Sequence, residues 1–383
     1  MVTTTKPRRN SAIELLRIVA MLSIIAFHGH LHFWSDKLKL PQISDVFVNN
    51  MFNYNILFSY FVGWGGTLGN ALFILITGYF MINRKVNPQK LILLLATMLF
   101  YSWLIFIIVY LFMPQIYGTV TIKEILKGIA PILFAENWFV SCYIMFFCFV
   151  PYINRFLNSI ARDEYMAFLL IIFLFFILLP TVKISTYLKN APMIFFAFVY
   201  AIGGYIRLHI KDKINNEYHK KYRNICMLLL SLLLISIGTL EIIGVVTNKV
   251  FFIKHSQYFV QLFSIPLAIA MFLSFATMKP FFNKYVNIVG GTVLGIYLIH
   301  ENIFLRKIIW DYIFPNVDYM TSNWYILFYA IKVVAIFVIC SGIDLLRKRY
   351  IEPPMARVID RYFDTVSEYA KIKANNVIAL LNK

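Results

Sequence analysis

Long runs of apolar residues, separated by short polar segments, dominate the pattern along the chain. A run of about 17–25 apolar residues is long enough to cross a bilayer as a helix. About ten such runs are present: 12–33, 56–82, 91–113, 138–153, 164–180, 191–206, 225–246, 258–277, 286–304 and 323–344. The pattern therefore predicts an all-α integral membrane protein with about ten transmembrane helices.

Two stretches depart from a simple membrane span. The run 56–82 is long and glycine-rich between residues 63 and 69, so we expect it to be broken or preceded by a re-entrant piece. The stretch 122–134 is too short to cross the bilayer, and we expect it to lie at the membrane interface.

Composition supports the membrane assignment and excludes other classes. Hydrophobic residues make up 60% of the chain and charged residues only 14%, against about 25% charged in soluble proteins. Mean hydropathy is +0.72, which excludes a soluble enzyme, a disordered chain and a disulfide scaffold. The four cysteines lie in apolar runs without metal-ligand spacing, so neither disulfides nor a bound metal is expected.

The charge balance predicts how the chain is oriented. Lysine and arginine number 36 against 18 acidic residues, and no basic stretch interleaves with aromatics outside an apolar run, so the partner expected is the lipid bilayer and not nucleic acid. The segments on one side carry 24 of these basic residues and those on the other carry 10. The basic-rich segments are 1–11, 83–90, 154–163, 207–224, 278–285 and 345–383. The asymmetry predicts that both termini are cytoplasmic.

The chain divides into one membrane domain and a tail. Residues 1–350 form the multi-span domain, and the first apolar run lacks a cleavage site, so it is expected to be retained. Residues 351–383 follow as a cytoplasmic tail, with apolar residues at positions such as Val358, Ile359 and Phe363. That spacing predicts an amphipathic helix on the inner membrane surface.

The first apolar run is unusual because it contains five ionisable residues: Glu14, Arg17, His28, His30 and His32. Arg17 and His28 are eleven residues apart, which places them on one helix face, roughly 16 Å apart along the axis. Glu14 can pair with Arg17, and His32 continues the stripe, whereas His30 points elsewhere. A snorkelling arginine and a core histidine would explain the pair structurally. An ionisable residue inside a span is nevertheless a functional candidate by default.

Three further segments carry polar groups or small residues in apolar surroundings. The segment 290–302 contains Tyr297, His300 and Glu301. The apolar segment 71–80 has a small-residue step, Thr77-Gly78, near its end. Trp138 stands at the start of the apolar run 138–153. Taken singly, such features are typical of helix packing and interfacial anchoring.

Together these segments resemble the acyltransferase-3 family of integral membrane proteins. Asn10-x-x-x-Glu-Leu-Leu-Arg17 followed by His28 is similar to the first helix of that family, and residues 73–80 are similar to its Phe-Phe-x-Leu-Ser-Gly-Tyr segment. Trp138-Phe139 and the segment 297–302 resemble its later motifs. The similar segments occur in order from residue 10 to residue 302, and the branch most similar comprises bacterial surface-polysaccharide O-acyltransferases.

The resemblance implies a multi-pass enzyme of the bacterial plasma membrane. It would move an acyl group, commonly acetyl, from cytoplasmic acyl-CoA to a surface polysaccharide or lipid-linked glycan on the outer side. The family's arginine and histidine correspond to Arg17 and His28. Some members carry an Arg-x-x-Arg pair after the second helix, where this chain has Arg84-Lys85, and some append a hydrolase-like domain that is not found here.

The implied roles agree with the chemistry of the residues. Arg17, paired with Glu14, and Arg84-Lys85 would hold the phosphates of acyl-CoA on the cytoplasmic side. His28 would either take the proton of the acceptor hydroxyl or itself accept the acyl group. We expect His300 and Glu301 to orient His28 or the acceptor.

Another class of function also fits a polytopic chain with a positive inner face. A glycan transporter, flippase or polymerase could use Arg17 and His28 as a substrate and proton relay, with the glycine-rich run as a broken helix. The absence of an internal repeat and the ordered family-like segments favour the acyltransferase.

The orientation can be tested by labelling. A cysteine introduced into segment 207–224 should be shielded from membrane-impermeant thiol reagents in intact cells, because the positive-inside bias places this loop in the cytoplasm. Labelling in intact cells as fast as in permeabilised cells would contradict the predicted orientation.

Overall fold

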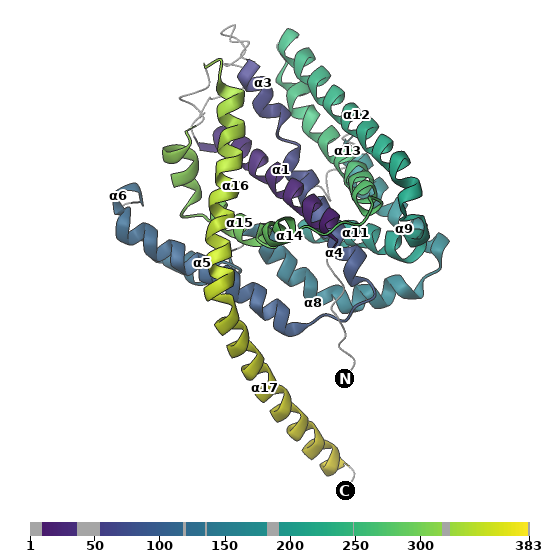
Figure 1. Cartoon of the computed structure of the whole chain (residues 1–383), viewed down its shortest axis with the longest axis vertical. Coiled ribbons are helices and arrows are strands. Elements are labelled where there is room, and N and C mark those ends of the chain that lie inside the picture. The colour runs from purple at the N-terminus through teal and green to yellow at the C-terminus, as the bar shows by residue number, and fades with distance from the viewer. Residues whose placement is uncertain are drawn as a thin grey trace.

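The computed structural model describes residues 10–36, 54–117, 120–134, 136–181, 191–247, 249–315 and 322–381. All regular elements in these ranges are helical (Figure 1). The α-helices of the first half are α1 (Ser11–Asp36), α3 (Tyr54–Phe61), α4 (Gly65–Met81), α5 (Pro88–Phe112), α6 (Pro114–Tyr117), α7 (Ile122–Ile129), α8 (Trp138–Ser159), α9 (Arg162–Phe173) and α10 (Leu179–Thr181). Those of the second half are α11 (Pro192–Tyr205), α12 (His219–Val246), α13 (Val250–Ala276), α14 (Lys284–Gly290), α15 (Val293–His300), α16 (Tyr325–Tyr350) and α17 (Glu352–Leu381).

Short irregular helical turns connect or extend several of these helices. The turns η1 (Leu174–Leu178), η2 (Ile206–Ile210) and η5 (Ile308–Ile313) are π-helical, and η3 (Lys211–Lys213) and η4 (Asn216–Tyr218) are 3-10 turns. Because η1 and η2 continue α9 and α11 without a break, they lengthen these helices toward the thickness of a bilayer.

Six helical segments in the described ranges are long and apolar enough to cross a membrane, which confirms the all-α membrane class. They are Ser11–His32, Pro88–Phe112, Trp138–Ser159, Pro192–Lys213, Asn216–Gly244 and Tyr325–Tyr350. Two shorter apolar helices, Gly65–Met81 and Leu262–Ala276, accompany them. The full count of ten spans and the cytoplasmic position of the termini stay predictions.

Helix α1 runs through the middle of the bundle and joins two hydrophobic clusters (Figure 1). One side of α1, including Leu16 and Ala20, packs in a cluster with α4, α8, α11, α12 and α13. Another side, including Met21 and Ile25, packs in a second cluster with α5, α15, α16 and η5. The core of the protein is therefore built around its first helix.

The glycine-rich run is broken, as the sequence predicts. Helix α3 ends at Phe61, and α4 begins at Gly65 after a short turn. A side chain on Gly69 would put its Cβ atom 2.7 Å from the carbonyl oxygen of Ala20 on α1. Glycine is therefore needed here so that α4 can approach α1 closely.

A second break interrupts the run 286–304, which the sequence analysis treats as one continuous span. Helix α14 ends at Gly290, and α15 begins at Val293. A Cβ atom on Gly290 would lie 2.8 Å from the Cβ atom of Glu14, so the chain can pass α1 at this point only without a side chain. Helix α15 is a short, separate helix that ends at His300 in the buried interior.

The tail after residue 351 forms the helix predicted from its apolar spacing. Helix α17 continues beyond the bundle from the end of α16 (Figure 1). Val358 and Tyr362 are among its exposed apolar side chains. The position of this helix on the inner membrane surface stays a prediction.

The close approach of α4 to α1 can be tested by adding one methyl group. The Gly69→Ala substitution should lower the free energy of unfolding by about 1–3 kcal/mol, because the new Cβ atom must displace backbone or Ile24. The measurement is the thermal unfolding midpoint of the detergent-solubilised protein. Gly238→Ala is the matched control, since a Cβ atom there meets nothing within 4 Å. Equal midpoints for the two variants would contradict the tight packing.

Candidate active site

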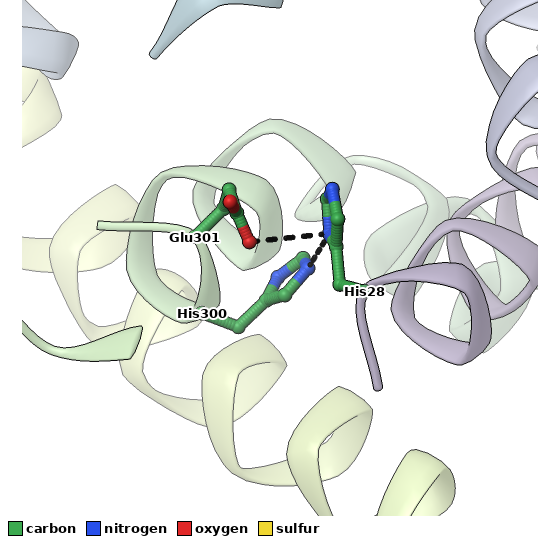
Figure 2. Close-up of side chains that lie close together, drawn as sticks. All are labelled: His28, His300 and Glu301. Atoms are coloured by element: carbon green, nitrogen blue, oxygen red, sulfur yellow. Dashed lines mark hydrogen bonds and ion pairs between the residues drawn. The ribbon is translucent and has the colours of Figure 1, made fainter. Parts of the chain in front are cut away.

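Three buried side chains from two helices meet at the end of α15 (Figure 2). His28 comes from α1, and His300 and Glu301 come from the C-terminal end of α15. The Nδ1 atom of His28 lies 2.9 Å from Nε2 of His300 and 3.4 Å from Oε2 of Glu301. His300 is fully buried, and His28 and Glu301 are 5% and 6% exposed. The structure thus brings together all three residues that the sequence analysis selects as catalytic candidates.

The hydrogen bonds determine which nitrogen atoms carry protons. The Nδ1 atom of His300 lies 2.6 Å from the carbonyl oxygen of Ile296, which can only accept, so Nδ1 donates. In neutral His300, Nε2 is then an acceptor, and it accepts from Nδ1–H of His28. The remaining nitrogen of His28, Nε2, therefore keeps its lone pair. Within the described part of the chain, this atom makes no hydrogen bond, so it is available as a base.

Glu301 is held by two further basic groups. Nε2 of His32 donates to its carboxylate at 2.9 and 3.2 Å, and Nη1 of Arg306 lies 3.5 Å from Oε1. The ring of His32 stacks on Trp310 with centroids 6.0 Å apart. These contacts fix the carboxylate beside His28 and compensate its charge, which a buried carboxylate requires.

The helix face predicted for the histidines agrees with the structure. His32 reaches the same cluster as His28, whereas Nδ1 of His30 contacts the hydroxyl of Ser59 on α3 at 3.1 Å. His30 is therefore a packing residue on another face of α1.

A cavity of about 330 Å³ lies between α1 and α15 on the side of Arg17. Along α1 it is lined by Arg17, Met21 and Ile24, and His28 is the next residue on this stripe. Along α14 and α15 its wall includes Gly290 and Tyr297. The ring of Tyr297 lies 6.2 Å from that of His28, centroid to centroid. The cavity therefore extends from a cationic end at Arg17 toward the histidine cluster.

The separate sequence segments selected in the sequence analysis meet around this cavity. Phe73 and Thr77 line it from α4, and Phe139 and Tyr143 line it from α8. The rings of Phe139 and Tyr297 are 6.0 Å apart, so the segments that contain them are neighbours in the fold. Segments that are individually typical of helix packing thus form the walls of one site.

Two cations lie at the end of the cavity away from His28. Nη1 of Arg17 lies 3.0 Å from Oε1 of Glu14, which confirms the predicted pair. The second cation is Lys348, near the end of α16, which the sequence analysis does not select. Its only signal in the sequence is the basic run Arg347-Lys348-Arg349, which also fits the positive-inside bias.

Arg84 and Lys85 line a different cavity. With Arg155 and residues of α8, they surround a space of about 450 Å³ at the end of α4. Both side chains are exposed. The structure therefore does not group them with Arg17 around one cavity.

The histidine cluster could also hold a metal ion. One ligand atom from each of His28, His300 and Glu301 lies within 4.8 Å of the others, and imidazole and carboxylate groups suit a divalent transition metal. A metal bound through Nδ1 of His28 would displace the proton that this atom carries in the hydrogen-bond pattern described above. The expectation that the site works without a metal stays a prediction.

The fold and the site define a multi-pass helical membrane protein with a buried histidine–carboxylate cluster beside a cationic cavity. A family model described as an acyltransferase domain, Acyl_transf_3, matches residues 10–344. The chain therefore belongs to the acyltransferase-3 family, which confirms the resemblance found in the sequence and makes the protein a membrane acyltransferase. Neither a curated protein nor a solved structure gives a significant match.

Metal removal tests the protonation pattern of the cluster. Dialysis of the purified protein against EDTA and 1,10-phenanthroline should leave acyl transfer unchanged, because acid–base catalysis by His28, supported by His300 and Glu301, does not require a metal. Elemental analysis before and after dialysis is the companion measurement. Loss of activity together with about one equivalent of released metal, and recovery with zinc, would contradict the proton-based arrangement.

Proposed function

We propose that this protein transfers an acyl group, most simply acetyl, from cytoplasmic acyl-CoA to a hydroxyl of a surface polysaccharide or lipid-linked glycan. The transfer would take place in the plasma membrane of a bacterium, with the acceptor on the outer side. The observation that carries the proposal is the cavity whose lining follows α1 from Arg17 through Met21 and Ile24 toward His28. A phosphate-bearing donor with a long thioester arm suits such a cavity, because one end is cationic and the walls are largely apolar.

The donor would lie along α1. Its phosphates would contact Arg17, which Glu14 holds in place, and its pantetheine arm would pass Met21 and Ile24. His28 is eleven positions after Arg17 on the helix, which corresponds to roughly 16 Å. An extended arm of this length would bring the thioester carbon to the level of Tyr297 and His28. Arg84 and Lys85, on the second cavity, would contribute to the cytoplasmic positive potential rather than to this contact.

The chemistry would use the free nitrogen of His28. Nε2 would take the proton of the acceptor hydroxyl as its oxygen attacks the thioester carbonyl carbon. A carbon–oxygen bond then forms and the carbon–sulfur bond breaks. The proton passes from Nε2 to the departing thiolate, so that free CoA and an O-acyl ester are the products. The acceptor and the donor would meet at this residue from opposite sides of the membrane.

His300 and Glu301 would act on His28 and not on the substrate. When Nε2 takes a proton, the imidazole becomes a cation, and Oε2 of Glu301 at 3.4 Å from Nδ1 stabilises it. His300 keeps the proton on Nδ1 of His28. Because Nδ1 of His300 donates to the carbonyl oxygen of Ile296, Nε2 of His300 can only accept from His28. Together the two residues select the tautomer that leaves Nε2 unprotonated.

The central role of His28 can be tested by substitution. His28→Ala should reduce acyl transfer by about 10²–10⁴-fold, the usual cost of removing an acid–base group, while membrane abundance and CoA binding stay near parental values. The measurement is transfer of labelled acetyl from acetyl-CoA to glycan precursors by purified protein. His30→Ala is the matched control, because His30 contacts Ser59 and not the cluster.

Two outcomes would count against the proposal, and a third would change the role of His28. Near-parental transfer by His28→Ala would remove this residue from the mechanism. If the parental protein moved glycan across the membrane of proteoliposomes without any acyl transfer, a transporter or flippase would be favoured. Label retained on the parent in the absence of acceptor, and lost in His28→Ala, would indicate that His28 carries the acyl group itself.

A further inference from the structure

Lys348 lines the cavity proposed for the donor and has no acidic partner among the described residues. It lines the cavity together with Arg17, and no ion pair joins it to another described residue, whereas Arg17 is paired with Glu14. A Cβ atom on Gly291 would lie 3.4 Å from Nζ of Lys348, so the ammonium sits beside the break between α14 and α15. A half-buried cation in a largely apolar cavity is costly unless an anion compensates it.

A buried network holds the end of α16 in the position that directs Lys348 to the cavity. Oδ1 of Asp344 accepts hydrogen bonds from the hydroxyl of Tyr101 at 2.8 Å and from Nε of Arg347 at 2.7 Å. Nη2 of Arg347 lies 2.8 Å from Oε2 of Glu352. Asp344 is fully buried and packs where Gly295 of α15 has no side chain. Lys348 follows Asp344 by four residues and therefore shares its helix face toward α15.

The first turn of α15 adds a third source of positive potential at the end of the cavity that Arg17 and Lys348 line. Val293 and Leu294, at the start of the helix, line the same cavity. Thr292, at the N-cap position, does not cap the helix with its side chain, because its hydroxyl donates to the carbonyl of Val289 and contacts Ser341. Uncapped N–H groups at the start of a helix, together with two cations, form a favourable environment for a phosphate group.

We infer that Lys348, Arg17 and the first turn of α15 form the binding site for the diphosphate of the thioester donor. The inference rests on the proposed function and deepens it, because it assigns the phosphate contact to Lys348 in place of Arg84 and Lys85. A diphosphate fits better than a single phosphate, because two cations belong to the same end of one cavity. The acyl arm then extends from the phosphates along α1 toward His28.

The test compares donors with and without phosphates. Purified protein in nanodiscs of neutral phosphatidylcholine is titrated with acetyl-CoA and with S-acetyl-pantetheine, which lacks the diphosphate. Lys348→Ala should weaken acetyl-CoA binding about ten- to a hundredfold, the usual effect of losing a charge-assisted contact, and leave S-acetyl-pantetheine binding unchanged. Lys348→Arg should retain most of the affinity, and Lys348→Glu should weaken it further. Arg349→Ala is the matched control, since Arg349 is exposed and does not line the cavity.

Four results would overturn the inference, and each has a different meaning. Parental acetyl-CoA affinity in Lys348→Ala would place the diphosphate elsewhere. An effect of Lys348→Ala that appears only in anionic phosphatidylglycerol nanodiscs would show that Lys348 binds a lipid headgroup and not the donor. Equal weakening of both donors would show that Lys348 maintains the shape of the cavity. Failure of the parent to bind acetyl-CoA at all would instead overturn the proposed donor, and this site with it.

Discussion

The structure depends on one constraint: α1 carries ionisable side chains through the apolar interior of a membrane protein, so other parts of the chain must solvate them. Glu14 pairs with Arg17, and His28 contacts His300 and Glu301. An ionisable group left in hydrocarbon without such partners would cost several kcal/mol. The surrounding helices therefore pack on α1 from both sides, and glycine residues permit the closest approaches. The cavity and the histidine cluster lie along the same face of this helix.

Much of this arrangement can be predicted from the sequence because it is local to one helix. The spacing of Arg17, His28 and His32 defines their common face, and the apolar runs define the helical membrane class. The helical membrane class is confirmed, as is the family membership that the ordered segments indicate. His28 and His32 both contact Glu301, which agrees with their predicted common face. The acyl donor, the acceptor and the absence of a metal stay predictions, because they concern molecules outside the chain.

The remaining features depend on contacts between residues far apart in the sequence. No periodicity within residues 286–304 indicates the helix break after Gly290, and the requirement for glycine there comes from Glu14, which is far away in the sequence. The position of Lys348 is not evident from the sequence for a similar reason. A basic residue after a span fits the positive-inside bias, and its place beside Gly291 in the cavity depends on how α16 packs against α15. Arg84 and Lys85 show the converse, because being predicted on the same side of the membrane as Arg17 does not imply lining the same cavity.

The sequence separation between His28 and His300 has a consequence for biosynthesis. The two residues are 272 positions apart, so α1 enters the membrane long before α15 has been translated. At about 5–20 residues per second, that interval is on the order of half a minute. During this time Glu14 and Arg17 are already neutralised, because their ion pair lies within a single helix turn. The charged end of α1 thus brings its own counter-ion into the bilayer, whereas the histidine end acquires its partners only when the last spans assemble.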